Sequence, residues 1–187
     1  MYVGYGAAAA ERGLVGVTVE HRLYGSVDYD GAVEDVRAAV EYAQKLDGVD
    51  PDRVALWFFS GGGLLATDWL AAPPSWLRCV ALTYPVLAPV LPLAPAPPHY
   101  QPTQALSGVG DLPLLLTRVG REAPPIAETV TAFVAEAHTQ GRSLEVIDVP
   151  DGRHGFDMLD HDDDSRRAVR AALSWVTRTL EMRTGLQ

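Results

Sequence analysis

Apolar residues along the chain fall into short runs, and these runs alternate with segments in which apolar residues recur every three or four positions. A short apolar run predicts a buried strand, and the three-to-four spacing predicts an amphipathic helix. Because parallel strands need crossover connections, this alternation predicts an α/β fold with an open, mostly parallel sheet of about five strands flanked by helices. The strands are expected at residues 14–19, 53–59, 78–83, 114–119 and 144–149, and the helices at residues 5–12, 30–46, 64–70, 126–140 and 164–182.

One segment interrupts the alternation. Residues 85–112 are too rich in proline for regular structure, and they are longer than an ordinary connection. We expect them to form a loop or lid-like insertion that covers a site or is mobile. Nothing else divides the chain, and a length of 187 residues favours one domain. Residues 1–187 are therefore expected to form a single domain.

Composition and charge narrow the classes of partner. The chain has 24 acidic and 15 basic residues, a formal net charge of -9, which would repel a nucleic-acid backbone. The long apolar stretch at residues 79–98 is broken by prolines, so it predicts no membrane span. A single cysteine, Cys79, excludes an internal disulfide and fits a reducing compartment. The start has no signal-peptide pattern, so we expect a cytoplasmic protein that binds neither nucleic acid nor membrane.

The strand expected at residues 53–59 runs directly into Ser60 and three glycines. A buried strand that turns sharply at a serine and re-enters a helix is the setting of a nucleophile elbow, where a strained turn exposes the hydroxyl. Ser60 is therefore the candidate nucleophile. The amide of Gly61, at the start of the following helix, is the candidate oxyanion donor. The plainer alternative is a serine that only caps a helix.

A serine nucleophile needs a base and a group that orients the base. Glu122 and His154 each follow a later predicted strand. The carboxyl ends of parallel strands lie at one edge of a sheet, so both side chains could reach Ser60. Asp148 and Asp151 are alternative orienting groups for the imidazole.

The chain order of serine, acid and histidine resembles that of the α/β-hydrolase superfamily. The resemblance covers almost the whole chain and is greatest to the dienelactone-hydrolase-like and carboxylesterase branch. It implies hydrolysis of a carboxylic ester by Ser60, His154 and Glu122, with Gly61 stabilising the oxyanion and with no metal or organic cofactor. The proline-rich residues 85–112 are expected to border the acyl site, which would suit a small to medium apolar ester. The stretches that carry it are V-T-V-E-H-R-L-Y-G followed by E-D-V-R-A-A-V-E-Y, D-P-D-R-V-A-L-W-F-F-S-G-G-G, and G-R-H-G-F-D.

Two features depart from the family pattern. Phe58 stands where the elbow has its first glycine. The family's first three strands are not recognised, nor is its H-G-G-G-type loop, which would supply a second oxyanion amide. Loss of one such donor costs about 10²–10³ in rate, so weak activity is expected. The strand expected at residues 14–19 would then pair directly with residues 53–59 or leave a sheet edge that a homodimer could cover.

Other interpretations of the same residues stay open. A glycine pattern that begins at Gly61 fits a dinucleotide fingerprint, but the next predicted strand ends without the required acid. The acidic run at residues 160–164 lacks the turn glycine and the bidentate glutamate of a calcium loop, and capping of the last helix by Asp162 or Asp163 is the simpler interpretation. Finally, the chain could be a non-catalytic or incomplete remnant of the fold that acts in assembly or partner binding.

Overall fold

The computed structural model describes residues 2–23 and 27–182. Four strands form a single parallel sheet, with each strand beside the next one in the chain. The predicted α/β fold with an open parallel sheet is confirmed, with four strands in place of about five. The strands are β1 (Val54–Phe59), β2 (Leu77–Thr83), β3 (Leu114–Arg121) and β4 (Leu144–Arg153).

The strand expected at residues 14–19 does not form. This segment has no regular secondary structure and pairs with no strand, and Val15 and Val17 are 56% and 40% exposed. A β-branched run becomes a strand only where a neighbour supplies backbone partners, and β1 forms a ladder only with β2 in the described ranges. Direct pairing of residues 14–19 with β1 is therefore wrong. A homodimer that covers this edge stays a prediction.

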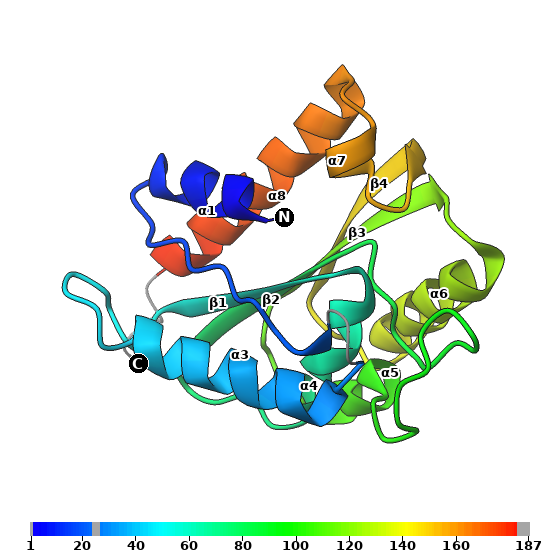
Figure 1. Cartoon of the computed structure of the whole chain (residues 1–187), viewed down its shortest axis with the longest axis horizontal. Coiled ribbons are helices and arrows are strands. Elements are labelled where there is room, and N and C mark those ends of the chain that lie inside the picture. Colours follow the sequence, from blue (N-terminus) through cyan, green and yellow to red (C-terminus); the bar gives the residue numbers. More distant parts are fainter. Residues whose placement is uncertain (1, 24–26, 183–187) are drawn as a thin grey trace.

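The sheet is the middle of three layers (Figure 1). Two helices, α1 (Val3–Ala10) and α8 (Asp163–Glu181), lie on one face. The other face is covered by α3 (Tyr29–Ala43), α4 (Thr67–Ala71) and α6 (Pro124–Thr139). Within the described residues, no helix combines the length and the apolar character that crossing a membrane requires.

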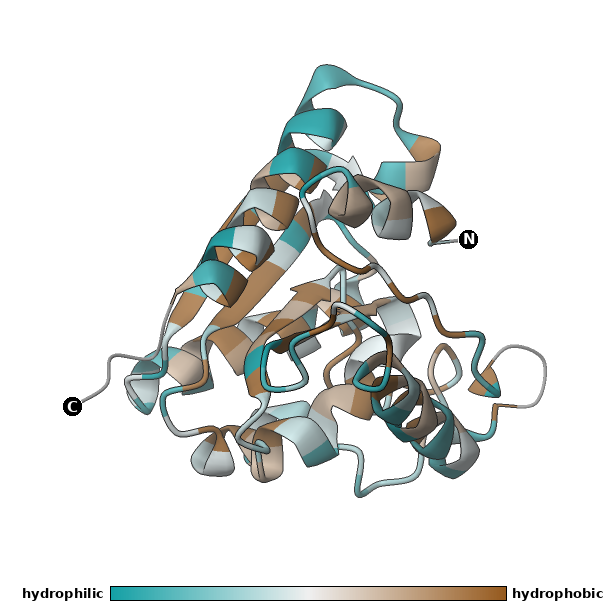
Figure 2. Cartoon of the chain, turned by 90° about the vertical axis from the view of Figure 1, so that its left-hand side faces the viewer, coloured by the Kyte–Doolittle hydropathy of each residue, from teal (hydrophilic) through white to brown (hydrophobic). Residues whose placement is uncertain are grey.

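Alternation along the strands explains the two-sided core. Successive strand side chains point to opposite faces, so Leu56 and Phe58 join the cluster beneath α3 and α4, whereas Ala55 and Trp57 pack toward α8. Strands buried on both faces are apolar throughout, and the covering helices need only one apolar side. Figure 2 shows this contrast: the strands are largely brown, and α8 carries both teal and brown residues.

The proline-rich segment packs closely against the turn that follows β1. Val86 and Leu87 are buried, and the Val86 N–H donates to the Ser60 carbonyl at 2.9 Å. Its tip is open, with Leu91 and Leu93 80% and 58% exposed. A lid-like role for residues 85–112 stays a prediction. Two short helices end the segment: α5 (Pro102–Ala105) and η2 (Leu106–Gly108).

A 3₁₀ helix, η1 (Ser60–Ala66), leads from β1 into α4. A Cβ placed on Gly63 would lie 2.7 Å from the Pro85 Cβ and 2.7 Å from the Val86 carbonyl oxygen. The same atom on Gly62 would meet nothing within 4 Å. The close approach of the proline-rich segment therefore requires glycine at position 63 and leaves position 62 free.

We predict that Gly63→Ala lowers the free energy of unfolding by about 1–3 kcal/mol, the usual cost of forcing an extra carbon into a packed site. Gly62→Ala is the matched control and should stay within about 1 kcal/mol of the parent. Urea denaturation of the two variants measures the difference. Equal stability of the two variants would contradict the packing assigned to Gly63.

We also predict that the Cys79 thiol is inert in the folded protein. The side chain is fully buried in β2, and burial raises its pKa to about 12. Since the thiolate is the reactive form, native protein should be alkylated at least about 100-fold more slowly than urea-unfolded protein, whose thiol pKa is about 8.5. At pH 9 the unfolded protein should still react much faster than the native protein, because the native thiol remains far below its pKa. Rapid alkylation of the native protein would contradict this.

Candidate active site

Four residues of interest lie at the carboxyl edge of the sheet, each directly after the last residue of a strand. Ser60 follows β1, Tyr84 follows β2, Glu122 follows β3 and His154 follows β4. The parallel register brings these four residues, which are far apart in sequence, to the same edge of the sheet. Three of them are the candidates expected from the sequence.

Ser60 sits at a strained turn. Its φ is +51°, in a region that costs a non-glycine residue roughly 1–2 kcal/mol. Such strain is found where surrounding structure holds a functional side chain in place. Phe58, at the position of the family's first elbow glycine, points into the core and is 6% exposed, so its bulk is accommodated by the packing under α3 and α4.

The structure brings Ser60, His154 and Glu122 into one hydrogen-bonded chain. Ser60 Oγ lies 2.6 Å from His154 Nε2, and His154 Nδ1 lies 2.6 Å from Glu122 Oε2. If Nδ1 carries the proton and donates it to the carboxylate, Nε2 is the acceptor that faces the hydroxyl. This arrangement has the geometry of a nucleophile, a base and a group that orients the base.

Both carboxylate oxygens of Glu122 are hydrogen-bonded, which fixes its side chain beside His154. Its other oxygen, Oε1, accepts a hydrogen bond from the Ala123 N–H at 2.8 Å, and its side chain is only 5% exposed. The His154 side chain is more open, at 33%. The imidazole is therefore accessible from outside, while the carboxylate behind it is shielded from water, which strengthens the charge-assisted hydrogen bond.

The alternative orienting groups lie elsewhere. Asp148 pairs with Arg118, and Asp151 pairs with Arg121, both between exposed side chains of neighbouring strands. Neither carboxylate has a hydrogen bond to His154. Exposed pairs of this kind contribute little to stability.

Gly61 occupies the second position of η1, and a Cβ built on it would meet no atom within 4 Å. The first N–H groups of a helix have no acceptor within the helix, so this amide is available to an incoming oxygen. The site therefore has a donor beside the serine and space around it.

The acidic run before α8 is engaged in capping and ion pairs. Asp162 accepts from the Ser165 N–H at 2.7 Å and caps the helix, as one of the two sequence interpretations expected. Asp163 pairs with Arg166. Nowhere in residues 2–23 and 27–182 do three or more histidine, cysteine, aspartate or glutamate side chains gather as a metal site.

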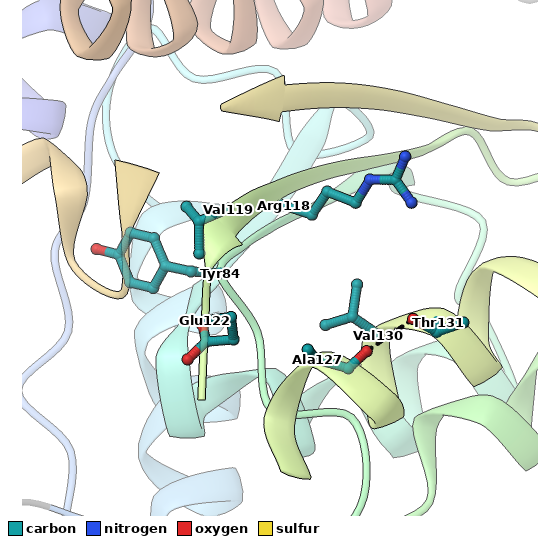
Figure 3. Close-up of a pocket in the computed structure, with 7 residues that line it drawn as sticks. All are labelled: Tyr84, Arg118, Val119, Glu122, Ala127, Val130 and Thr131. Carbon is teal, nitrogen blue, oxygen red and sulfur yellow. Dashed lines mark hydrogen bonds between the residues drawn. The ribbon is translucent and has the colours of Figure 1, made fainter. Parts of the chain in front are cut away.

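A cavity of about 110 Å³ lies beside Glu122, between β3 and α6 (Figure 3). Ligand sites usually measure about 300–1,000 Å³, so this cavity is too small to hold a substrate by itself. Figure 3 shows the Tyr84 ring at its border, with the hydroxyl directed away from α6. The lining residues are Tyr84, Arg118, Val119, Glu122, Ala127, Val130 and Thr131.

Tyr84 lies at the same edge of the sheet as Ser60, Glu122 and His154, but the sequence did not mark it as a candidate. Its ring lies beside the imidazole of His154, with ring centroids 5.0 Å apart. The available signal was its position, because it directly follows a strand in the same way as the three candidates. Aromatic residues after strands are more often core than site, and sequence offers no means to separate the two cases.

Among characterised sequences, the chain is similar to "Putative esterase NocK" from Nocardia uniformis subsp. tsuyamanensis. The two are 33% identical over an alignment 131 positions long, which covers 63% of this chain and 38% of that protein. The chain therefore covers much less than two thirds of this relative. No protein-family model matches the chain.

Solved structures show the same fold. An esterase from Thermogutta terrifontis superposes with a TM-score of 0.77 and 17% identity, over 100% of this chain and 79% of that one. A "Putative Dienelactone Hydrolase" from Klebsiella pneumoniae subsp. pneumoniae superposes with a TM-score of 0.65 and 17% identity, over 81% of this chain and 62% of that one. The chain thus has the α/β-hydrolase fold, and it resembles the dienelactone-hydrolase-like and esterase members of that superfamily.

Proposed function

We propose that the protein is a serine hydrolase that cleaves carboxylic esters through an acyl-enzyme. The observation that carries the proposal is the unbroken chain from Ser60 Oγ through His154 to the shielded carboxylate of Glu122, with 2.6 Å at each link. Two of the similar proteins named above are described as esterases, which supports the same class of reaction. Fold alone would not, because one fold hosts many activities.

In the first half of the reaction, Ser60 Oγ attacks the ester carbonyl carbon while His154 Nε2 takes the hydroxyl proton. The resulting imidazolium is stabilised by Glu122, which accepts the Nδ1 hydrogen bond throughout. As the tetrahedral intermediate collapses, the bond to the alcohol oxygen breaks, and His154 returns its proton to that oxygen. The products of this half are the free alcohol and a serine ester.

In the second half, water replaces the alcohol. His154 takes a proton from the water molecule, whose oxygen attacks the acyl carbon. Collapse of this second intermediate breaks the bond to Ser60 Oγ, which recovers its proton from the imidazolium. The carboxylic acid leaves, and no metal or organic cofactor takes part in either half.

The negative oxygen of each intermediate needs preorganised donors. Gly61 supplies one N–H at the start of η1. With a single donor, turnover should be slow, since removal of one oxyanion donor costs about 10²–10³ in rate.

The proline-rich segment is the proposed border of the acyl site. It meets the nucleophile turn through the hydrogen bond from Val86 to Ser60, and the exposed Leu91 and Leu93 at its tip offer apolar surface. The proposed substrate is therefore a small to medium apolar ester.

Reaction with a fluorophosphonate tests the nucleophile without knowledge of the substrate. We expect a single adduct by intact mass, and none in Ser60→Ala. Thermogutta terrifontis esterase 2, one of the structural neighbours, has been observed phosphorylated by paraoxon, a related organophosphate. No adduct on folded parent protein would contradict the proposal and favour the non-catalytic alternative, in which the fold acts in assembly or partner binding.

Substitution of the carboxylate distinguishes Glu122 from its neighbours. We predict that Glu122→Gln slows labelling by roughly 10²–10⁴, because an amide in place of the carboxylate favours the wrong imidazole tautomer and leaves the imidazolium without its counter-charge. The matched control is Asp151→Asn, at the exposed pair with Arg121, which should label within about twofold of the parent. A large loss in Asp151→Asn together with an active Glu122→Gln would reassign the acid.

A further inference from the structure

Asp157, three residues beyond His154, accepts hydrogen bonds from the hydroxyls of two tyrosines. Its Oδ1 accepts a hydrogen bond from the Tyr84 hydroxyl at 2.8 Å, and its Oδ2 accepts one from the Tyr5 hydroxyl at 2.8 Å. All three side chains are at least partly buried. The proposed reaction gives none of them a role. A carboxylate with one donor on each oxygen, in partly buried surroundings, is a well-defined anchor.

Tyr84 links this anchor to the imidazole. Its ring lies 5.0 Å from the His154 ring, tilted by 56°, and 5.8 Å from the ring of Phe156 at 89°. The residue is 1% exposed, and its φ of +37° is unusual for an aromatic residue. Its N–H nevertheless continues the sheet by donating to the Thr117 carbonyl at 2.8 Å. The backbone therefore holds the ring firmly against His154.

Tyr5 brings the amino-terminal helix α1 to the same anchor. Its ring packs edge-on against Trp57 and Phe59 of β1, with centroids 5.0 and 4.8 Å apart, and its hydroxyl reaches Asp157 from 152 positions away in the chain. The helix thus contacts both β1, which precedes the nucleophile, and α7, which follows the loop that carries the base.

Both phenols stay protonated, as donors must. Burial, followed by the negative charge of Asp157, raises the pKa of Tyr84 and of Tyr5. At neutral pH each hydroxyl therefore keeps the proton that it donates. The two hydrogen bonds persist over the pH range in which an imidazole serves as a base.

The loop after His154 needs such an anchor. Gly155 has a φ of +77°, and the chain then enters the short helix α7 (Phe156–Leu159). Glycine adds backbone freedom next to the imidazole, and the hydrogen bonds to Ser60 and Glu122 constrain only the ring. Asp157, in the first turn of α7, fixes the backbone on the far side of that glycine.

We propose that Asp157 is a positioning residue for His154, acting through its hydrogen bonds to Tyr84 and Tyr5, so that α1 is part of the support of the active site. This inference rests on the proposed function and deepens it. Displacement of a catalytic group by about 1 Å can cost up to 10²-fold in rate, so the support has a measurable effect.

The test compares Tyr84→Phe, Tyr5→Phe, Asp157→Asn and Asp157→Ala with the parent. Tyr84→Phe keeps the ring and removes the hydroxyl, with its hydrogen bond to Asp157 and its interaction with Tyr2. Asp157→Asn keeps one carbonyl oxygen as an acceptor, whereas Asp157→Ala keeps none. Tyr42→Phe on α3 is the control, because this tyrosine is 63% exposed and lies on the layer opposite α1.

We expect Tyr84→Phe and Asp157→Ala to lower kcat for p-nitrophenyl acetate roughly tenfold, with KM within about twofold. Asp157→Asn should recover part of the loss, Tyr5→Phe should show a smaller loss, and Tyr42→Phe should match the parent. Tyr84→Phe combined with Asp157→Ala should be no slower than Asp157→Ala alone, because the two changes break the same bond. Parent-like kcat in Tyr84→Phe and Asp157→Ala would overturn the proposal, as would a loss that appears in KM alone.

A second readout does not depend on catalysis. The downfield proton resonance of the His154 Nδ1–H, observed by NMR, should broaden or shift in Asp157→Ala and Tyr84→Phe and stay unchanged in Tyr42→Phe. If the parent neither reacts with a fluorophosphonate nor hydrolyses the ester, the proposed function fails, and this resonance still decides whether Asp157 positions the imidazole. An unchanged resonance in both variants would overturn the inference.

Discussion

Parallel pairing of the four strands is the constraint on which the rest of the molecule depends. Since all strands point the same way, their last residues meet at one edge, and the chain must return along the sheet through helices after each strand. Ser60, Tyr84, Glu122 and His154 are neighbours for this reason alone. The covering helices are a second consequence, because a parallel sheet needs both faces shielded from water.

The candidate site differs in character from the core below it. The core is formed by interdigitated aliphatic side chains on the two sheet faces. In such a core, a smaller side chain at one position can be compensated by a larger one beside it. The site depends on directional contacts that allow no such exchange: 2.6 Å between Ser60 and His154, and 2.6 Å between His154 and Glu122. The strained φ of Ser60 is held by neighbours such as Val86, whose N–H binds the serine carbonyl.

The likeness to solved α/β-hydrolases concerns the fold, and the argument for ester hydrolysis comes from the site. The chain covers 79% of the Thermogutta terrifontis esterase, while its match to NocK extends over 38% of that protein. Among the described residues, the edge strands β1 and β4 each pair with a strand on one side only, and residues 14–19 pair with none. Tyr5 is significant in this setting, since it ties α1 to Asp157 without any strand pairing.

The sequence by itself determined the order of the four paired strands and of the long helices around them, because hydrophobic periodicity is a local property that each segment carries alone. It also placed Ser60, Glu122 and His154 at or shortly after predicted strand ends and thereby named them as candidates, although β3 and β4 run two and four residues further than predicted. Only the tertiary structure decided which carboxylate faces the imidazole. Glu122 and Asp151 both follow predicted strands, but in the structure Asp151 lies within β4 and pairs with Arg121. Only the tertiary structure likewise determined that residues 14–19 form no strand, because a strand needs a neighbouring strand to pair with. The contacts of Asp157 with Tyr84 and Tyr5 join segments 73 and 152 positions apart, and no local pattern encodes such a distance.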